Sequence, residues 1–264
     1  MNNHQLVFLQ EGWNSIAYYS LNSNPKTLII FVHGFGGKSI ETWGDFPLYI
    51  KNYSEFNSTD VIFYGYKSTT TPAIGSAELF YKHLRGLVNP KKKLGDISRN
   101  DTIVNYKQIL FVGHSLGAVV IRRTLLDAKR DNCSWLQYCK IILFAPAHRG
   151  AHIHRLVIEG IPNSFKLIGS IAKYIFQSLN DLEESSSTIK DLISDNISYL
   201  DDPNNNAFTI AVDIVSAVND RVVLKNRFCQ DPNPLAIEDK GHISVCKPIL
   251  TEYEEPFEIV KKNL

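Results

Sequence analysis

Four short apolar runs constrain the fold more than any other feature of this sequence. They lie at residues 28–32, 61–64, 109–112 and 141–144. Each is rich in β-branched and aromatic residues, and none alternates with polar residues. Such runs are typical of strands buried on both faces, as in a parallel sheet covered by helices. Helical patterns at 73–88 and 118–129 separate them, which predicts an α/β fold with a mostly parallel sheet and right-handed crossovers.

The rest of the chain extends this sheet. A further run at 208–215 predicts a fifth buried strand, and residues 6–9 and 15–19 predict an antiparallel hairpin at one edge. In the helix at 118–129 the charged residues Arg122, Arg123 and Lys129 are expected to face water.

The segment at 151–206 interrupts the alternation of strands and helices. It contains no strand pattern, but apolar residues recur at helical spacing between 168 and 179. An insertion here is expected to cover the carboxyl ends of the strands as a helical lid, because ligands bind there in open α/β folds. The chain 1–264 is predicted to be a single domain with 151–206 as its lid.

Charge and cysteine content exclude several classes of function. Lys and Arg number 28 against 27 Asp and Glu, so the net charge of +1 argues against sequence-independent nucleic-acid binding. Four cysteines are too few for a disulfide scaffold in a chain of this length, and they form no CxxC pair, which argues against a zinc site. The first residues lack a basic start and a long apolar run, and no stretch reaches the roughly 18 apolar residues of a membrane helix. A soluble, cytoplasmic protein is therefore expected.

The motif GHSLG at 113–117 follows one buried run directly and precedes a helix. In this setting GxSxG predicts a nucleophile elbow, in which Ser115 occupies a sharp, strained turn at the edge of the sheet. Gly113 and Gly117 leave room for that turn, because they carry no side chains. His114 belongs to the same motif.

A second glycine-rich motif, HGFGG at 33–37, also follows a buried run. A nucleophilic serine creates an anionic tetrahedral intermediate, which needs backbone N–H groups already aimed at its oxygen. We expect these donors to be Leu116, which follows the nucleophile, and Phe35 in the HGFGG loop. Gly34 belongs to this motif, and His33 is expected to hold the loop by hydrogen bonds.

Together these motifs resemble the α/β-hydrolase superfamily. HGFGG followed by TWG at 42–44 is similar to intracellular lipase- and esterase-like members, including relatives of glycosylphosphatidylinositol inositol-deacylases and of phospholipid-remodelling lipases. APAHRG at 145–150 resembles their TPHRG segment, with Ala145 in place of Thr and Ala147 inserted. GHISVCKP at 241–248 resembles their histidine loop. The resemblance implies the chain order nucleophile, acid, histidine.

Candidates for the acid and the base lie near the C-terminal end of the sequence. His242 is the only histidine after His154, and in this chemistry it would take the proton of Ser115. Asp220 follows an apolar run in a D-x-V-V turn, where the family keeps its acid, and precedes His242 by 22 residues. Asp213, Glu238 and Asp239 remain as rivals for the acid.

These observations predict a serine hydrolase that cleaves carboxylic esters of small molecules or lipids and needs no cofactor. A thioesterase, amidase or acyltransferase on the same fold is the alternative, and a catalytically silent binding module is a further one. His148, His152 and His154 lie close together, but no carboxylate shares the usual spacing of metal ligands, so no metal is expected. Peripheral contact with membranes and a role in lipid metabolism are compatible with this assignment, and the oligomeric state is open.

Overall fold

The computed structural model describes residues 3–9, 12–87, 106–152, 180–202, 205 and 207–264. Its strands are β1 (His4–Phe8), β2 (Ile16–Ser20), β3 (Thr27–Val32), β4 (Thr59–Tyr64), β5 (Gln108–His114), β6 (Cys139–Phe144), β7 (Asp213–Ala217) and β8 (Leu235–Ile237). Its α-helices are α1 (Phe46–Asn52), α2 (Ala73–Leu87), α3 (Leu116–Arg130), α6 (Ser187–Leu200) and α7 (Glu255–Lys261). Within the described residues, no helix is both long and apolar enough to cross a bilayer.

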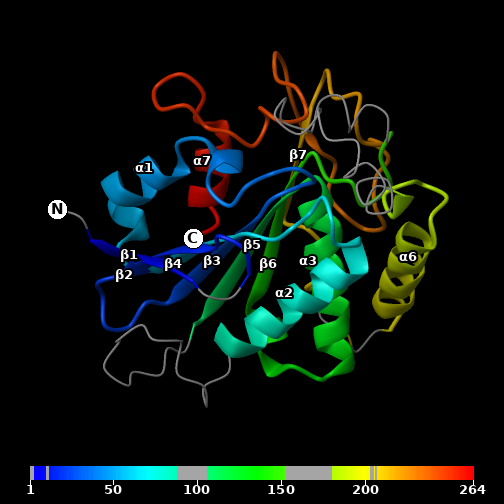
Figure 1. Ribbon diagram of the computed structural model, residues 1–264, viewed down its shortest axis with the longest axis horizontal. Coiled ribbons are helices and arrows are strands. Elements are labelled where there is room, and N and C mark those ends of the chain that lie inside the picture. The colour runs from blue at the N-terminus through cyan, green and yellow to red at the C-terminus, as the bar shows by residue number, and fades with distance from the viewer. Residues whose placement is uncertain (1–2, 10–11, 88–105, 153–179, 203–204, 206) are drawn as a thin grey trace.

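One eight-stranded sheet organises the molecule, in the order β1-β2-β4-β3-β5-β6-β7-β8 (Figure 1). All neighbours from β4 to β8 are parallel, whereas β1 and β2 form an antiparallel hairpin that pairs with β4. The four apolar runs form β3, β4, β5 and β6, so the predicted mostly parallel α/β sheet and its edge hairpin are confirmed. The run at 208–215 is only partly extended, because its strand begins at Asp213.

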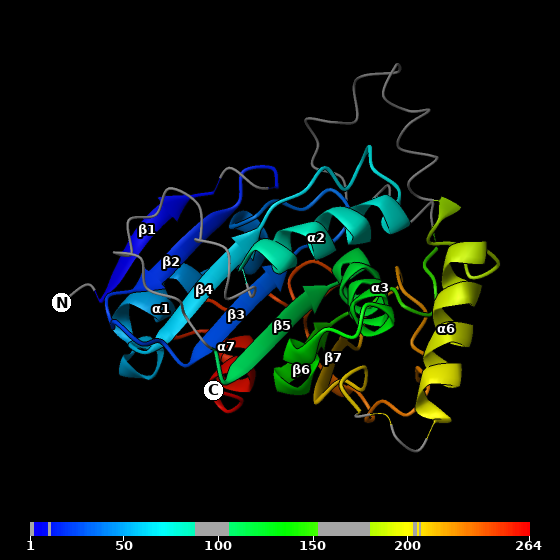
Figure 2. The ribbon, with the colours of Figure 1, turned by 90° about the horizontal axis from the view of Figure 1, so that it is seen from below.

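Helices cover both faces of the sheet. Figure 2 shows α2 and α3 on one side and α1 and α7 on the other. The helices α1 and α7 carry proline in their first turn, where the missing N–H is tolerated. They pack together through Tyr49 and Phe257, whose rings stack with centroids 4.0 Å apart. On the neighbouring strands β3 and β4, the rings of Phe31 and Phe63 stack with centroids 4.8 Å apart.

The helix α3 corrects one prediction. Arg123 and Lys129 lie toward its accessible side, but Arg122 is fully buried. Its guanidinium forms an ion pair with Asp231 at 2.5 Å. The assignment of Arg122 to the solvent face was therefore wrong, because a charged residue can be buried when a partner distant in sequence neutralises it.

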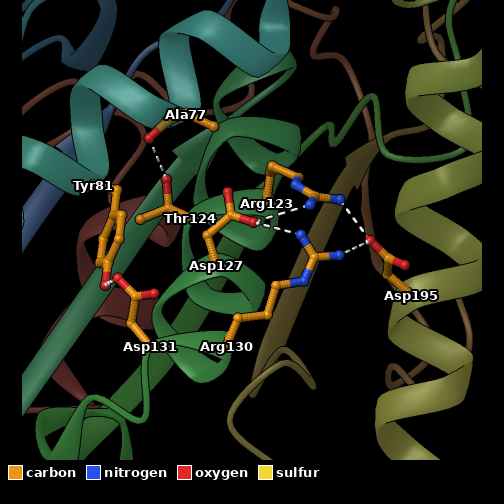
Figure 3. Close-up of polar contacts among 8 residues, drawn as sticks. All are labelled: Ala77, Tyr81, Arg123, Thr124, Asp127, Arg130, Asp131 and Asp195. Carbon is orange, nitrogen blue, oxygen red and sulfur yellow. Dashed lines mark hydrogen bonds and ion pairs between the residues drawn. The ribbon is translucent and has the colours of Figure 1, made fainter.

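The predicted insertion at 151–206 is described only at 151–152, 180–202 and 205, and its predicted helix at 168–179 lies outside the described residues. Its helix α6 runs beside α3 in both views (Figures 1 and 2). Asp195 of α6 accepts from Arg123 at 2.6 Å and from Arg130 at 2.7 Å, as Figure 3 shows. On its other side α3 binds α2, where the Thr124 hydroxyl donates to the carbonyl of Ala77 at 3.0 Å.

Candidate active site

Ser115 lies between the end of β5 and the start of α3. Its backbone has φ 53° and ψ −119°, a region that side-chain-bearing residues rarely adopt. This is the strained turn that GxSxG predicts. Gly117 explains part of the motif, since a Cβ there would lie 2.1 Å from the carbonyl oxygen of Val32. The tight approach of α3 to the end of β3 therefore requires glycine at this position.

Ser115, His242 and Asp220 lie in one hydrogen-bonded row. The Ser115 Oγ is 3.0 Å from His242 Nε2, and His242 Nδ1 is 2.9 Å from Asp220 Oδ2. All three side chains are buried. Because the carboxylate accepts, Nδ1 carries the proton, and Nε2 is left to accept from the serine hydroxyl. Three segments far apart in sequence thus bring a hydroxyl, an imidazole and a carboxylate together.

The surroundings of Asp220 favour its ionised form. Burial alone would raise its pKa, but the hydrogen bond and charge of His242 oppose this. The N–H groups of Val222 and Val223 also donate to Oδ1, at 2.8 and 3.3 Å. The net effect holds the pKa of Asp220 below its ordinary value.

The rival acids lie elsewhere. Asp213 is at the start of β7, where it accepts hydrogen bonds from Lys262 and Asn263 at 2.8 Å each. Glu238 and Asp239 are exposed after β8. The structure therefore places Asp220, and not these three, against His242.

The HGFGG loop lies directly against the serine. A Cβ on Gly34 would come within 2.7 Å of the Ser115 Cβ, so only glycine allows this contact. The backbone N–H groups of Phe35 and Leu116 donate no hydrogen bond to any described residue. Both N–H groups are therefore available as donors next to Ser115, Leu116 at the N-terminus of α3 and Phe35 in the loop.

His33 connects this loop to the segment after β4. Its Nδ1 donates to the Gly34 carbonyl at 2.8 Å, and its Nε2 accepts from the Tyr66 N–H at 3.3 Å. Burial lowers the pKa of His33 to about 4, so the ring is neutral near pH 7. Its hydrogen bonds support the loop.

Tyr66 and Ser68 also support the HGFGG loop, but the sequence motifs did not identify them as site residues. The Tyr66 ring stacks on His33 at 4.4 Å, and its hydroxyl donates to the His33 carbonyl at 2.8 Å. The Ser68 hydroxyl accepts from the Gly36 N–H at 3.0 Å. Both follow directly after β4, so their position at the carboxyl edge of the sheet was the one available signal.

His114 has a specific contact within the site. Its Nε2 donates to the carbonyl oxygen of His242 at 2.8 Å, and the two rings lie 5.0 Å apart. Burial, followed by the charge of His242, lowers the pKa of His114 to about 3. A neutral His114 therefore ties the histidine loop to the residue preceding the serine.

The histidine group at 148–154 is described only in part. His148 is buried against Phe228, with ring centroids 4.5 Å apart, and His154 lies outside the described residues. Among the described residues, no three His, Cys, Asp or Glu side chains are arranged to hold a metal ion.

Comparisons with known proteins agree with this fold. Residues 22–147 match the model of the family described as "Putative serine esterase (DUF676)", a span that contains Ser115 and the HGFGG loop but ends before Asp220 and His242. A search of curated proteins found no match.

Solved structures resemble the whole chain at low sequence identity. The peroxisomal α/β-hydrolase Lpx1 of Saccharomyces cerevisiae has a TM-score of 0.54 and 14% identity, covering 94% of this chain and 81% of that one. The α/β-hydrolase enzyme MGS-MChE2, from a lagoon-sediment metagenome, has a TM-score of 0.54 and 16% identity, covering 98% and 96%. The Bacillus licheniformis lipase BlEst2 has a TM-score of 0.51 and 14% identity, covering 90% and 92%. The chain therefore has the α/β-hydrolase fold.

Proposed function

We propose that this protein is a serine hydrolase that cleaves carboxylic esters through an acyl-enzyme on Ser115. The observation that carries the proposal is the row of hydrogen bonds from Ser115 through His242 to Asp220, at 3.0 and 2.9 Å. The matched family model and the α/β-hydrolase fold support it.

In the proposed reaction, His242 Nε2 takes the proton of Ser115 as Oγ attacks the ester carbonyl carbon. The N–H groups of Phe35 and Leu116 stabilise the oxyanion, and His242 returns the proton to the leaving alcohol. Water, activated by the same histidine, then attacks the acyl-enzyme and releases the acid. Asp220 orients the ring and stabilises its protonated form throughout.

The assay is hydrolysis of p-nitrophenyl esters from acetate to palmitate by wild type and Ser115→Ala. We expect kcat to fall by roughly 10⁴–10⁶-fold in the variant, since the serine, histidine and acid act as a unit. Asp220→Asn should lose about 10⁴-fold, because the amide favours the wrong tautomer of His242. Turnover retained by folded Ser115→Ala would refute the assignment.

Two further measurements separate the alternatives. Esters, thioesters and amides with the same acyl group compare ester cleavage with thioesterase or amidase activity. A fluorophosphonate probe labels Ser115 only if the serine is activated. A folded wild type that neither reacts with the probe nor hydrolyses any substrate would instead be a binding module. That residues 151–206 act as a lid stays a prediction, as does a cytoplasmic location.

A further inference from the structure

The motif TWG at 42–44 takes no part in the proposed reaction, yet it contacts both of the loops that do. Thr42 and Trp43 are buried. The Trp43 ring packs against the ring of Phe31 in β3, with centroids 4.9 Å apart. Because β3 leads directly into the HGFGG loop, Trp43 fixes this segment to the same strand that carries the loop.

Thr42 holds the far end of the HGFGG loop. Its Oγ1 accepts a hydrogen bond from the Lys38 N–H at 3.0 Å. A Cβ on Gly37 would lie 2.8 Å from the same oxygen, so the hydroxyl also packs closely against the loop. His33 holds the beginning of the loop through its own hydrogen bonds. The N–H of Phe35 therefore lies between two fixed ends.

The residues that follow Trp43 contact the end of the histidine loop. The Asp45 N–H donates to the Pro248 carbonyl oxygen at 3.0 Å, and the Asp45 carboxylate accepts from the Leu250 N–H at 3.0 Å. Gly44 has φ 54°, and a Cβ there would lie 2.6 Å from the same Pro248 oxygen. The histidine loop is thus fixed to the segment that also holds the HGFGG loop.

We propose that Thr42 is a positioning residue, which sets the Phe35 N–H relative to His242 in the active site. Thr42 meets both loops itself, because its carbonyl oxygen also accepts from the Cys246 thiol at 3.4 Å. An oxyanion donor is effective only when it is aimed in advance at the place where the charge develops. Without the Thr42 hydroxyl, the Lys38 N–H loses its acceptor and the end of the loop is released. The inference rests on the proposed ester cleavage.

The test compares Thr42→Val and Thr42→Ser with wild type on p-nitrophenyl esters. Titration of Ser115 with a fluorophosphonate gives the fraction of active protein in each sample. Valine matches threonine in shape but lacks the hydroxyl, whereas serine keeps it. We expect Thr42→Val to lower kcat by roughly 10–30-fold with little change in KM, which is less than the roughly 10²–10³-fold cost of removing an oxyanion donor outright. Thr42→Ser should recover most of the rate.

An inhibitor that imitates the oxyanion separates positioning from a general loss of structure. A trifluoromethyl ketone with the preferred acyl chain forms a tetrahedral adduct on Ser115. Its Ki should rise in Thr42→Val by the same factor as kcat/KM falls, because the adduct resembles the transition state. The acid limb of the pH profile of kcat/KM reports His242 and should not move, since Asp45 still fixes the histidine loop. A loss of rate with an unchanged Ki, or with a shifted limb, would overturn the proposal.

Thr124→Val is the matched control. Thr124 is also a buried threonine whose hydroxyl makes a hydrogen bond of 3.0 Å, to the carbonyl oxygen of Ala77 (Figure 3). The two valine variants should lose similar stability, but Thr124→Val should keep the kcat and Ki of wild type. Equal losses of rate in the two variants would overturn this inference and leave the proposed function in place. A folded wild type without turnover and without labelling of Ser115 would overturn both.

Discussion

Replacing Arg122 by methionine tests the buried ion pair most directly. Both partners are shielded from water, with side-chain exposures of 0% for Arg122 and 1% for Asp231. Methionine fills a similar volume but leaves the Asp231 carboxylate buried without its counter-charge. Removing one partner of a buried pair costs about 3–5 kcal/mol in the free energy of unfolding. For a chain of this size, that corresponds to a fall in Tm of roughly 6–20 °C.

The matched control is Arg130→Met on the same helix. Arg130 is 57% exposed and contacts Asp127 and Asp195 at 3.1 and 2.7 Å (Figure 3). Surface pairs of this kind contribute about 0–1 kcal/mol, so this variant should unfold almost as the wild type does. The two arginines differ chiefly in burial, which is the quantity under test.

A double variant isolates the cost of the unpaired charge. Arg122→Met/Asp231→Asn removes both charges but keeps an oxygen at position 231 for the N–H of Ala211, which binds Oδ1 at 3.0 Å. Urea unfolding should show that it recovers about 2–3 kcal/mol of the loss in the single variant. A cost below about 1 kcal/mol for Arg122→Met, or no recovery in the double variant, would refute this reasoning.

Three further predictions concern the proposed site. Gly117→Ala should abolish folding or lower Tm by more than 10 °C, measured by circular dichroism, because its Cβ would lie 2.1 Å from the Val32 oxygen. His114→Leu removes the donor to the His242 carbonyl and should lower kcat on p-nitrophenyl esters by about 10–100-fold with little change in KM. His114→Gln retains an N–H donor and should recover part of the rate. Equal rates in the two variants would contradict a positioning role. Stability should fall as pH drops below about 6.5, because the unfolded chain binds protons that folded His33 and His114, with pKa values of about 4 and 3, do not. Each histidine contributes up to about 1.4 kcal/mol per pH unit, and urea midpoints that stay level from pH 7 to 5 would disprove this.

The central strands could be predicted because their signal is local. Uninterrupted apolar runs identify strands buried on both faces, and the structure contains β3, β4, β5 and β6 at those positions. The elbow could also be predicted, because its GxSxG pattern is contiguous in the sequence, although the contacts that require glycine at 113 and 117 are made with other strands, at Leu143 and Val32. By contrast, β8 is short and largely exposed at the sheet edge, so no apolar run indicates it.

What could not be predicted depends on contacts between distant residues. Arg122 resembles any other helical arginine until Asp231, 109 positions later, is seen beside it. The helix α6 buries Thr188 and Asn196 along with its apolar residues, which weakens the helical pattern in its sequence. The bond from His114 to the His242 carbonyl spans 128 positions, and no spacing rule indicates it.

The separation between Ser115 and His242 also has a consequence during synthesis. The two residues are 127 positions apart, and the chain between them forms β6, β7 and β8. A nascent chain on the ribosome can form the elbow from β5 and α3 long before its histidine loop has emerged. On the proposed assignment, such a chain carries a serine without a base and stays inert. Hydrolysis would then begin only after the histidine loop has also emerged and packed against the elbow, so that the onset of turnover reports the arrival of His242.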